Sequence, residues 1–285
     1  MQGTTVRRVG LVLALVTALA GPTACTSPDP ADRPGEDDRA PRGGSLTALR
    51  SAERATERAG SARVESTTTM GSLMSMTADG TLGWGDGVTG TLTITYTGGT
   101  VADTMRRLGS TSMEARYLPD AYYARMGEKF AERVGGKNWI RYAYEDLEAL
   151  AGGAGSHLGE QIRSSTPNQS VKLLLASEDV RKVGEESVRG RPATHWSGTV
   201  ETADVTDPAL RKRLTEAGVT TETVDIWIDK RNLLVKKVEK ARTATGPMTQ
   251  TAHYGDYGVR VRVERPPRSD TGDFEDLVGQ QDGTP

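Results

Sequence analysis

The sequence has 285 residues, of which 35% are hydrophobic, and its 36 basic and 38 acidic residues give a net charge of −2. Because nucleic-acid binding requires a basic face, this balance argues against a nucleic-acid partner. The single cysteine excludes a disulfide framework within the chain and a zinc site built from cysteines. When the two ends discussed below are set aside, about 220 residues are left, enough for one large domain.

The N-terminus has the pattern of an export signal. Arg7 and Arg8 precede an apolar run over residues 9–20. That run is too short to span a hydrocarbon core of about 30 Å as a helix. We therefore predict a signal peptide over residues 1–24.

The next residues predict a lipid anchor. Thr23, Ala24 and Cys25 resemble the lipobox of bacterial lipoproteins, in which small residues precede a cysteine that receives a diacylglycerol. Pro22 departs from that motif, which usually has Leu, Val or Ile there. Acyl chains of the palmitate type on Cys25 would hold the protein at the cell membrane, on its extracellular face. Ordinary secretion after cleavage near Ala24, and an uncleaved anchor, are the alternatives.

Two segments lack the apolar residues that a folded core needs. Residues 25–44 contain several Pro, Asp and Arg residues, and we expect them to form a disordered tether behind the lipidated cysteine. Residues 267–285 are rich in Pro, Asp and Gly, and we expect a disordered tail in which only Phe274 and Leu277 could dock.

Residues 45–266 are expected to form the folded domain. A helix is predicted over 45–60, where Ser45 can cap the first turn and Gly60 can end the last. Residues 88–97 are the clearest strand because hydrophobic residues and threonines alternate there. This alternation predicts one dry face, buried against the core, and one wet face, exposed to solvent. The predicted dry face consists of Val88, Gly90, Leu92, Ile94 and Tyr96.

The same reasoning assigns the other elements. Further strands are predicted over 62–70, 80–85, 112–118, 121–126, 193–200, 223–229, 233–241, 249–254 and 259–263, and another begins at 180–184 and leads into 186–189. Residues 137–141 form a short strand-like segment, and helices are predicted over 145–151, 157–163, 168–177 and 208–217. About ten or eleven strands joined by tight turns indicate an α+β domain with one long antiparallel meander. A sheet of that size must curl, and a few amphipathic helices then cover its concave face.

Several strand and turn motifs carry a resemblance to a known family: Tyr122-Tyr123-x-Arg125, Lys137-x-Trp139, Thr194-His195-Trp196, the run from Val224 to Asp229, and the run from His253 to Gly258. Over residues 45–266 the chain resembles actinobacterial lipoproteins of the LppX/LprAFG type, and it is more distantly similar to the carrier LolA and the sensor RseB.

The resemblance implies a half-barrel sheet wrapped around helices, with an apolar cavity that holds acyl chains in some members. The residues that we expect to line it are Leu92, Ile94, Tyr96, Met113, Tyr117, Ile226 and Ile228. Buried acyl chains contribute about 0.8 kcal/mol per CH₂ group. The alternative is that these side chains form a closed core without a cavity.

No pattern of catalytic or metal-binding residues stands out in the sequence. His157, His195 and His253 lie far apart and form no H-E-x-x-H motif, and no G-x-S-x-G elbow is present. Asp225 and Asp229 flank Trp227, but a solvated strand face is the simpler interpretation of this acidic pair. We therefore expect no catalytic residue, no metal and no cofactor.

The function expected from the sequence is a membrane-anchored lipoprotein that binds or carries a lipid or other amphiphile in an apolar cavity. The alternative is an RseB-like regulatory or interaction module that contacts another envelope protein, for which edge strands are suited. An enzyme acting on envelope polymers is the third candidate, supported only by scattered carboxylates.

Overall fold

One sheet of 12 strands forms the framework of the described chain. The structure is a computed structural model that describes residues 42–125, 127–132, 135–149 and 166–277. Cys25, His157 and the predicted helix over 157–163 lie outside the described residues. The strands are β1 Ser61–Met70, β2 Met74–Gly83, β3 Thr89–Gly98, β4 Ser112–Tyr117, β5 Ala121–Arg125, β6 Trp139–Ala143, β7 Arg181–Val188, β8 Arg191–Glu201, β9 Thr221–Asp229, β10 Leu234–Thr243, β11 Gly246–Gly255 and β12 Thr271–Asp273.

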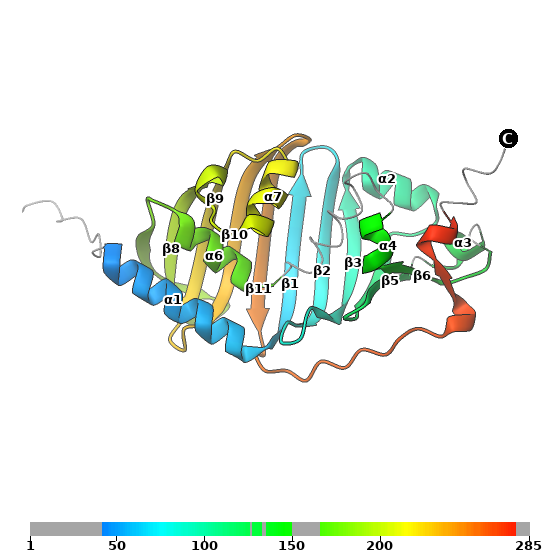
Figure 1. Cartoon of the computed structure of the whole chain (residues 1–285), viewed down its shortest axis with the longest axis horizontal. Helices are drawn as coiled ribbons and strands as arrows, with labels where there is room; N and C mark the ends of the chain where they lie inside the picture. Colours follow the sequence, from blue (N-terminus) through cyan, green and yellow to red (C-terminus); the bar gives the residue numbers. More distant parts are fainter. Residues whose placement is uncertain (1–41, 126, 133–134, 150–165, 278–285) are drawn as a thin grey trace, which may run out of the picture. The chain divides into compact units, whose positions relative to one another are not determined.

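The strand order is β12-β6-β5-β4-β3-β2-β1-β11-β10-β9-β8-β7. Neighbouring strands pair antiparallel except β12, which pairs parallel with β6. The predicted α+β class and curled antiparallel sheet are therefore confirmed (Figure 1). The sheet is built from two meanders, β1–β6 and β7–β11, and the pairing of β1 with β11 joins them, whereas the sequence predicted a single meander.

Among the residues that the structure describes, helices cover the two halves of the sheet unequally. They are α1 Arg42–Ala59, α2 Gly99–Arg107, α3 Glu128–Ala131, α4 Tyr144–Ala149, α6 Asn168–Ala176 and α7 Pro208–Glu216. Figure 1 shows α1, α6 and α7 across the strands β8–β11, while α2 lies beside β3 and α4 beside β6. No helix among the residues described is long and apolar enough to cross a membrane.

The core lies between the sheet and these helices. Leu49 of α1, Leu174 of α6 and Ile226 of β9 are fully buried in one hydrophobic cluster. The alternation predicted for 88–97 is confirmed, since Leu92 and Ile94 of β3 belong to the same cluster. The predicted helix at 208–217 is also confirmed as α7, whose first turn is capped by a hydrogen bond from the Leu210 amide to Asp207 (3.0 Å).

The strand predicted over 259–263 is wrong. Residues 256–267, which we call the crossing segment, begin with a turn at 256–258 and continue without ladder pairing. They run along the ends of the strands, from β11 towards β12 (Figure 1). Ser61 Oγ donates to the Val259 carbonyl (2.6 Å) and Arg116 donates to the Glu264 carbonyl (2.8 Å). The alternating valines look like a strand, but strand ends offer no edge for ladder pairing.

The tail after residue 266 also differs from the expected disorder over its described part. Arg268–Asp270 forms the short helix η3, β12 follows it, and residues 274–277 are helical. Lys137 Nζ donates to the Ser269 carbonyl (2.7 Å), and the Asn138 amide donates to Asp270 (3.0 Å). Polar contacts therefore order this segment, which has few apolar residues. The other predicted domain boundaries stay predictions.

Candidate ligand-binding site

A row of tyrosines crosses the concave side of β4, β5 and β6. Tyr117 is the register partner of Tyr122, and Tyr122 is the partner of Tyr142. The ring centroids of the first pair are 5.2 Å apart and those of the second pair 5.6 Å. Phe274 extends the row, with its ring 4.7 Å from that of Tyr142. Directly paired positions bring aromatic side chains into contact, so the register itself builds this row.

Met113 lies beside the row and links it to β3. The hydroxyl groups of Tyr96 and Tyr122 lie 3.4 Å and 3.8 Å from its sulfur atom. We call the set formed by Tyr96, Met113, Tyr117, Tyr122, Tyr142 and Phe274 the tyrosine face. A flexible thioether among aromatic rings adapts readily to apolar groups of different shape.

The phenols of the tyrosine face are uncharged at neutral pH. Burial raises the pKa of Tyr142 to about 12. Burial, reinforced by the neighbouring phenols, raises the pKa of Tyr117 and Tyr122 further still. The face is therefore apolar in character and carries only neutral hydroxyl groups.

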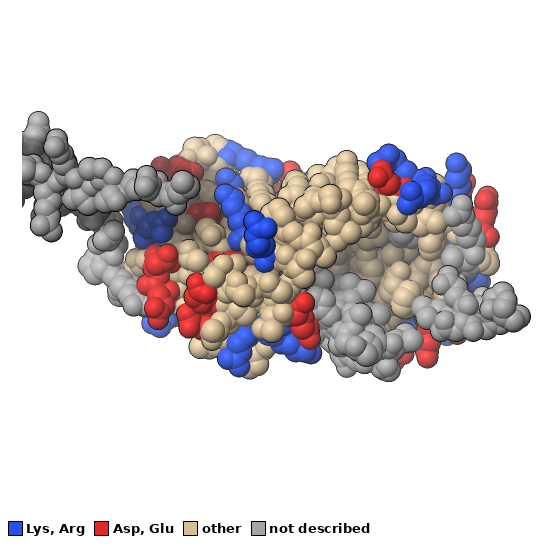
Figure 2. Space-filling view, turned by 90° about the horizontal axis from the view of Figure 1, so that it is seen from above, with Lys and Arg blue, Asp and Glu red and all other residues tan. Residues whose placement is uncertain are grey.

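Part of the tyrosine face is accessible. Tyr117 and Tyr122 are buried, but Tyr96, Met113 and Tyr142 are only partly buried. In Figure 2 the surface of uncharged residues is hollowed on the side of the molecule where α2 lies. Apolar concave surfaces with a few polar groups are typical of small-molecule sites.

The structure divides the seven predicted lining residues into two groups. Leu92, Ile94, Tyr96, Met113 and Tyr117 lie on the adjacent strands β3 and β4, where Ile94 pairs with Met113. Ile226 and Ile228 lie on β9, on which α6 packs, and both are buried. Their role as lining stays a prediction.

The sequence analysis missed three members of the tyrosine face as lining residues. Tyr122 was part of a family motif, and its contact with Tyr142 follows from the register of β5 with β6, which the sequence did not show. Phe274 was one of two tail residues that could dock, and its position against Tyr142 depends on the fold of the tail.

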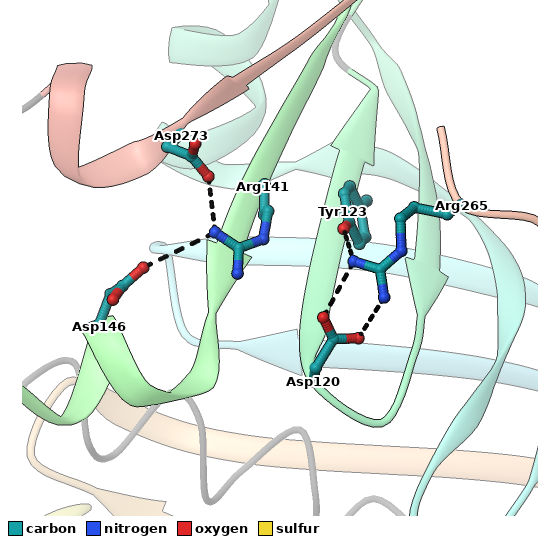
Figure 3. A network of polar contacts seen from close by, with 6 residues as sticks. All are labelled: Asp120, Tyr123, Arg141, Asp146, Arg265 and Asp273. Atoms are coloured by element: carbon teal, nitrogen blue, oxygen red, sulfur yellow. Dashed lines mark hydrogen bonds and ion pairs between the residues drawn. The ribbon is translucent and has the colours of Figure 1, made fainter. Parts of the chain in front are cut away.

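Ion pairs fasten the segments that carry Phe274 to the sheet (Figure 3). Arg265 of the crossing segment donates to both carboxylate oxygens of Asp120 (2.9 and 2.8 Å) and to the hydroxyl of Tyr123 (2.7 Å). Arg141 of β6 donates to Asp273 of β12 (2.8 Å). These contacts hold the C-terminal segment along the β6 edge.

The other half of the sheet buries a group of charges in its core. Lys237 Nζ lies 2.8 Å from Glu239, and both residues are almost fully buried. Burial, together with the nearby charge of Glu239, raises the pKa of Glu222 to about 8. Burial opposes ionisation of Glu239 as well, but the charge and hydrogen bond of Lys237 outweigh it and lower the pKa of that carboxyl. This charged core is a poor environment for an acyl chain.

His195 lies on the opposite face of the sheet. Its two ring nitrogens lie 2.9 Å from Glu186 and 2.9 Å from Asp225, and its ring stacks on Trp227 at 4.1 Å. Asp229 accepts hydrogen bonds from the Arg231 and Leu233 amides and so closes the turn after β9. Within the described ranges, no group of three or more His, Cys, Asp or Glu side chains could hold a metal ion.

Two cavities lie away from the tyrosine face. One, of about 340 Å³, lies between the turn at Trp84–Gly87 and Val259 and Val261 of the crossing segment. The other, of about 180 Å³, is lined by arginines beside β1.

Comparison with known proteins identifies the family. A Streptomyces coelicolor protein named "Putative lipoprotein SCO4650" is 58% identical over 299 aligned positions, which cover 99% of each chain. The chain belongs to this lipoprotein family. A 31.2 kDa Streptomyces griseus protein from the rplA-rplJ intergenic region is 50% identical over 251 positions, 84% of the lipoprotein described here and 82% of the relative. No protein-family model matches the chain.

The lipoprotein also shares its fold with a solved structure. The crystal structure of the Mycobacterium tuberculosis lipoprotein LppX matches 79% of the chain and 100% of LppX, with a TM-score of 0.50 and 16% identity. This likeness shows the fold alone. The predicted resemblance to lipoproteins of the LppX type is thus confirmed.

Proposed function

We propose that this lipoprotein binds an amphiphile whose acyl chain lies on the tyrosine face. The observation that carries this proposal is the row of neutral aromatic rings from Tyr117 to Phe274 on the concave side of the sheet, in which Tyr142 and Phe274 are only partly buried. In the other half of the sheet, α6 packs on β8 and β9.

The dimensions of the tyrosine face suit an acyl chain. From β3 to β6 there are three strand spacings of about 4.8 Å, or about 14 Å in all. Each CH₂ group removed from water contributes about 0.8 kcal/mol, so a chain of that length can bind firmly. The sulfur of Met113 can shift to fit chains that differ in branching or unsaturation.

The proposed role is to bind and carry rather than to catalyse. In this proposal residues 1–24 direct export, the acylated Cys25 anchors the protein on the extracellular face of the membrane, and residues 25–44 tether the domain of residues 45–266. The small residues Thr23 and Ala24 before Cys25 support the anchor, and the similarity to a Streptomyces coelicolor putative lipoprotein supports a location at the membrane.

Photo-crosslinking tests the proposed site. The full-length protein, purified from membranes in detergent, is mixed with a phospholipid that carries a diazirine at the end of one acyl chain, irradiated, and mapped by peptide mass spectrometry. Label is expected on β3–β6, including Tyr96 and Tyr142. Label scattered over the molecule, or concentrated on the opposite face, would overturn the proposal.

A matched pair of variants sharpens the test. Met113→Glu places a charge on the tyrosine face and is expected to lower labelling at least fivefold, whereas Met113→Leu keeps the face apolar and is expected to retain it. Equal labelling of both variants would contradict the site. Far-UV circular dichroism establishes that each variant is folded. If a variant is unfolded, the crosslinking map of the wild-type protein still tests the proposed site.

The regulatory alternative, in which the domain contacts another envelope protein, stays a prediction. A stoichiometric protein partner recovered from membranes, together with no acyl-chain labelling, would favour it.

A further inference from the structure

An arginine-rich cavity of about 180 Å³ lies on the side of the sheet opposite the tyrosine face. Its polar lining comes from three separate parts of the chain: Arg63 and Glu65 of β1, Arg189 and Arg191 at the turn between β7 and β8, and His253 and Asp256 at the end of β11. Arg63 and Glu65 flank the core residue Val64, so alternation along β1 places them on the outer face. We call this cavity the arginine pocket.

The turn between β7 and β8 reaches over the sheet to form one wall. Arg189 Nη2 lies 2.8 Å from Glu65 Oε2, although β9, β10 and β11 separate β8 from β1 in the sheet. Val188 of this hairpin packs with Trp227 and Val235 in a small apolar cluster. This cluster supports the wall and fixes where the arginines lie.

The backbone of this turn is unfavourable for an arginine. Arg189 and Gly190 both have positive φ (52° and 80°), the geometry of a two-residue hairpin turn that favours Asn-Gly. The positive-φ position in the turn between β9 and β10 is indeed an asparagine, Asn232 (φ 61°). A side chain kept in a strained position indicates a use for that side chain.

The charges of the pocket are incompletely paired. Arg63 forms two hydrogen bonds to Asp79 (3.1 and 3.0 Å) and lies 3.9 Å from Glu65, which also accepts from Arg189. The side chain of Arg191 has no hydrogen-bond or ion-pair partner within the part of the chain that the structure describes. One guanidinium in the lining is therefore free to bind an anion.

His253 adds an uncharged ring to the lining of the pocket. Burial lowers the pKa of His253, and the charges of Arg189 and Lys236 lower it further. The neutral imidazole offers one donor and one acceptor.

We propose that the arginine pocket binds a phosphate group. Guanidinium groups match the oxygens of phosphate in pairs, and Arg189 and Arg191 stand on the same tight turn. The volume corresponds to about six waters at about 30 Å³ each, enough for a phosphate and a small esterified group. The phosphate can belong to a lipid headgroup or be free in solution, and the two sources differ in charge and size.

Calorimetric titration of the full-length protein in a neutral detergent tests this site, at constant ionic strength set with sodium chloride. One arm uses inorganic phosphate and the other glycerophosphoglycerol, the soluble headgroup diester of phosphatidylglycerol. Binding of either ligand above the chloride background supports the pocket, and the tighter ligand identifies the source. Binding of neither overturns the proposal.

Three variants tie the binding to the pocket. Arg189→Asn removes a guanidinium but suits the turn, so it should weaken binding at least fivefold without lowering the melting temperature. Arg191→Ala should weaken binding at least fivefold as well. Arg242→Ala is the matched control, because the Arg242 side chain is exposed, lies on the same face at the far end of β10, and has no partner among the described residues. Equal affinity in all three variants would overturn the assignment.

Discussion

The ring of Phe274 lies 4.7 Å from the ring of Tyr142, so the C-terminal segment supplies the last member of an aromatic row that begins on β4. The tail is thus part of the candidate site, although Phe274 lies 132 positions after Tyr142 in the sequence. Arg141 pairs with Asp273 next to Phe274 and positions this segment.

Phe274→Ala should weaken the fold moderately. Phe274 is only partly buried, so the loss is expected to be about 1–2 kcal/mol of unfolding free energy, less than the 3–5 kcal/mol of a core phenylalanine. Urea denaturation followed by circular dichroism measures it. Val183→Ala is the control, because Val183 is 50% exposed and its truncation should cost less than about 0.5 kcal/mol. Equal effects of the two variants would contradict docking of the tail.

Glu222→Gln should flatten the dependence of stability on pH. The pKa of Glu222 is raised from 4.5 to about 8, so the folded protein retains a proton that the unfolded chain releases across this window. The unfolding free energy of the wild type should therefore fall as pH rises from about 4.5 to about 8. Gln cannot titrate, so the variant should lose less stability over the same range, as urea denaturation at pH 5, 6.5 and 8 would measure. An unchanged pH slope would contradict the raised pKa.

Glu239→Gln is the contrasting variant for the same cluster. It leaves the buried Lys237 without its carboxylate partner, which should cost about 3–5 kcal/mol near neutral pH. The pKa of Glu239 is lowered, so the stability it contributes is present above about pH 4.5 and is lost as pH falls below that value. The two carboxyls, which share one cluster, should thus have opposite pH signatures.

Trp84→Ala should be among the most destabilising single substitutions. Trp84 is 5% exposed, its indole nitrogen donates to the Thr56 carbonyl of α1 (3.2 Å), and its ring meets Tyr257 edge-on at 6.3 Å. Removal of the ring should cost about 3–5 kcal/mol in urea denaturation. Trp84→Phe keeps most of the packing but loses the donor, so it should cost about 1–3 kcal/mol. A loss below that range for Trp84→Ala would show that the ring does not join α1 to the crossing segment.

Cys25→Ser tests the anchor independently of the fold. Acyl chains attached at Cys25 should carry the wild type into the detergent phase of a Triton X-114 separation, and the serine variant should remain in the aqueous phase. The melting temperature of the Cys25→Ser variant should equal that of the wild type. If the variant still partitioned with the detergent, the lipid anchor would be assigned to the wrong residue.

Local patterns were sufficient to predict most elements of this protein. The alternation along 88–97 and the cap at Asp207 depend on neighbours within a few residues, so the sequence alone was enough to predict β3 and α7. The anchor at Cys25 stays a prediction from the same kind of local pattern. The tertiary structure alone decided that β11 pairs with β1, that residues 256–267 run past strand ends, and that Phe274 meets Tyr142. These contacts join residues far apart in the chain. Which of the possible pairings forms depends on the total surface that all of them bury, weighed against the entropy cost of closing the loops between them. Periodicity shows which face of a strand is dry, but it does not show whether a helix or a ligand will cover that face.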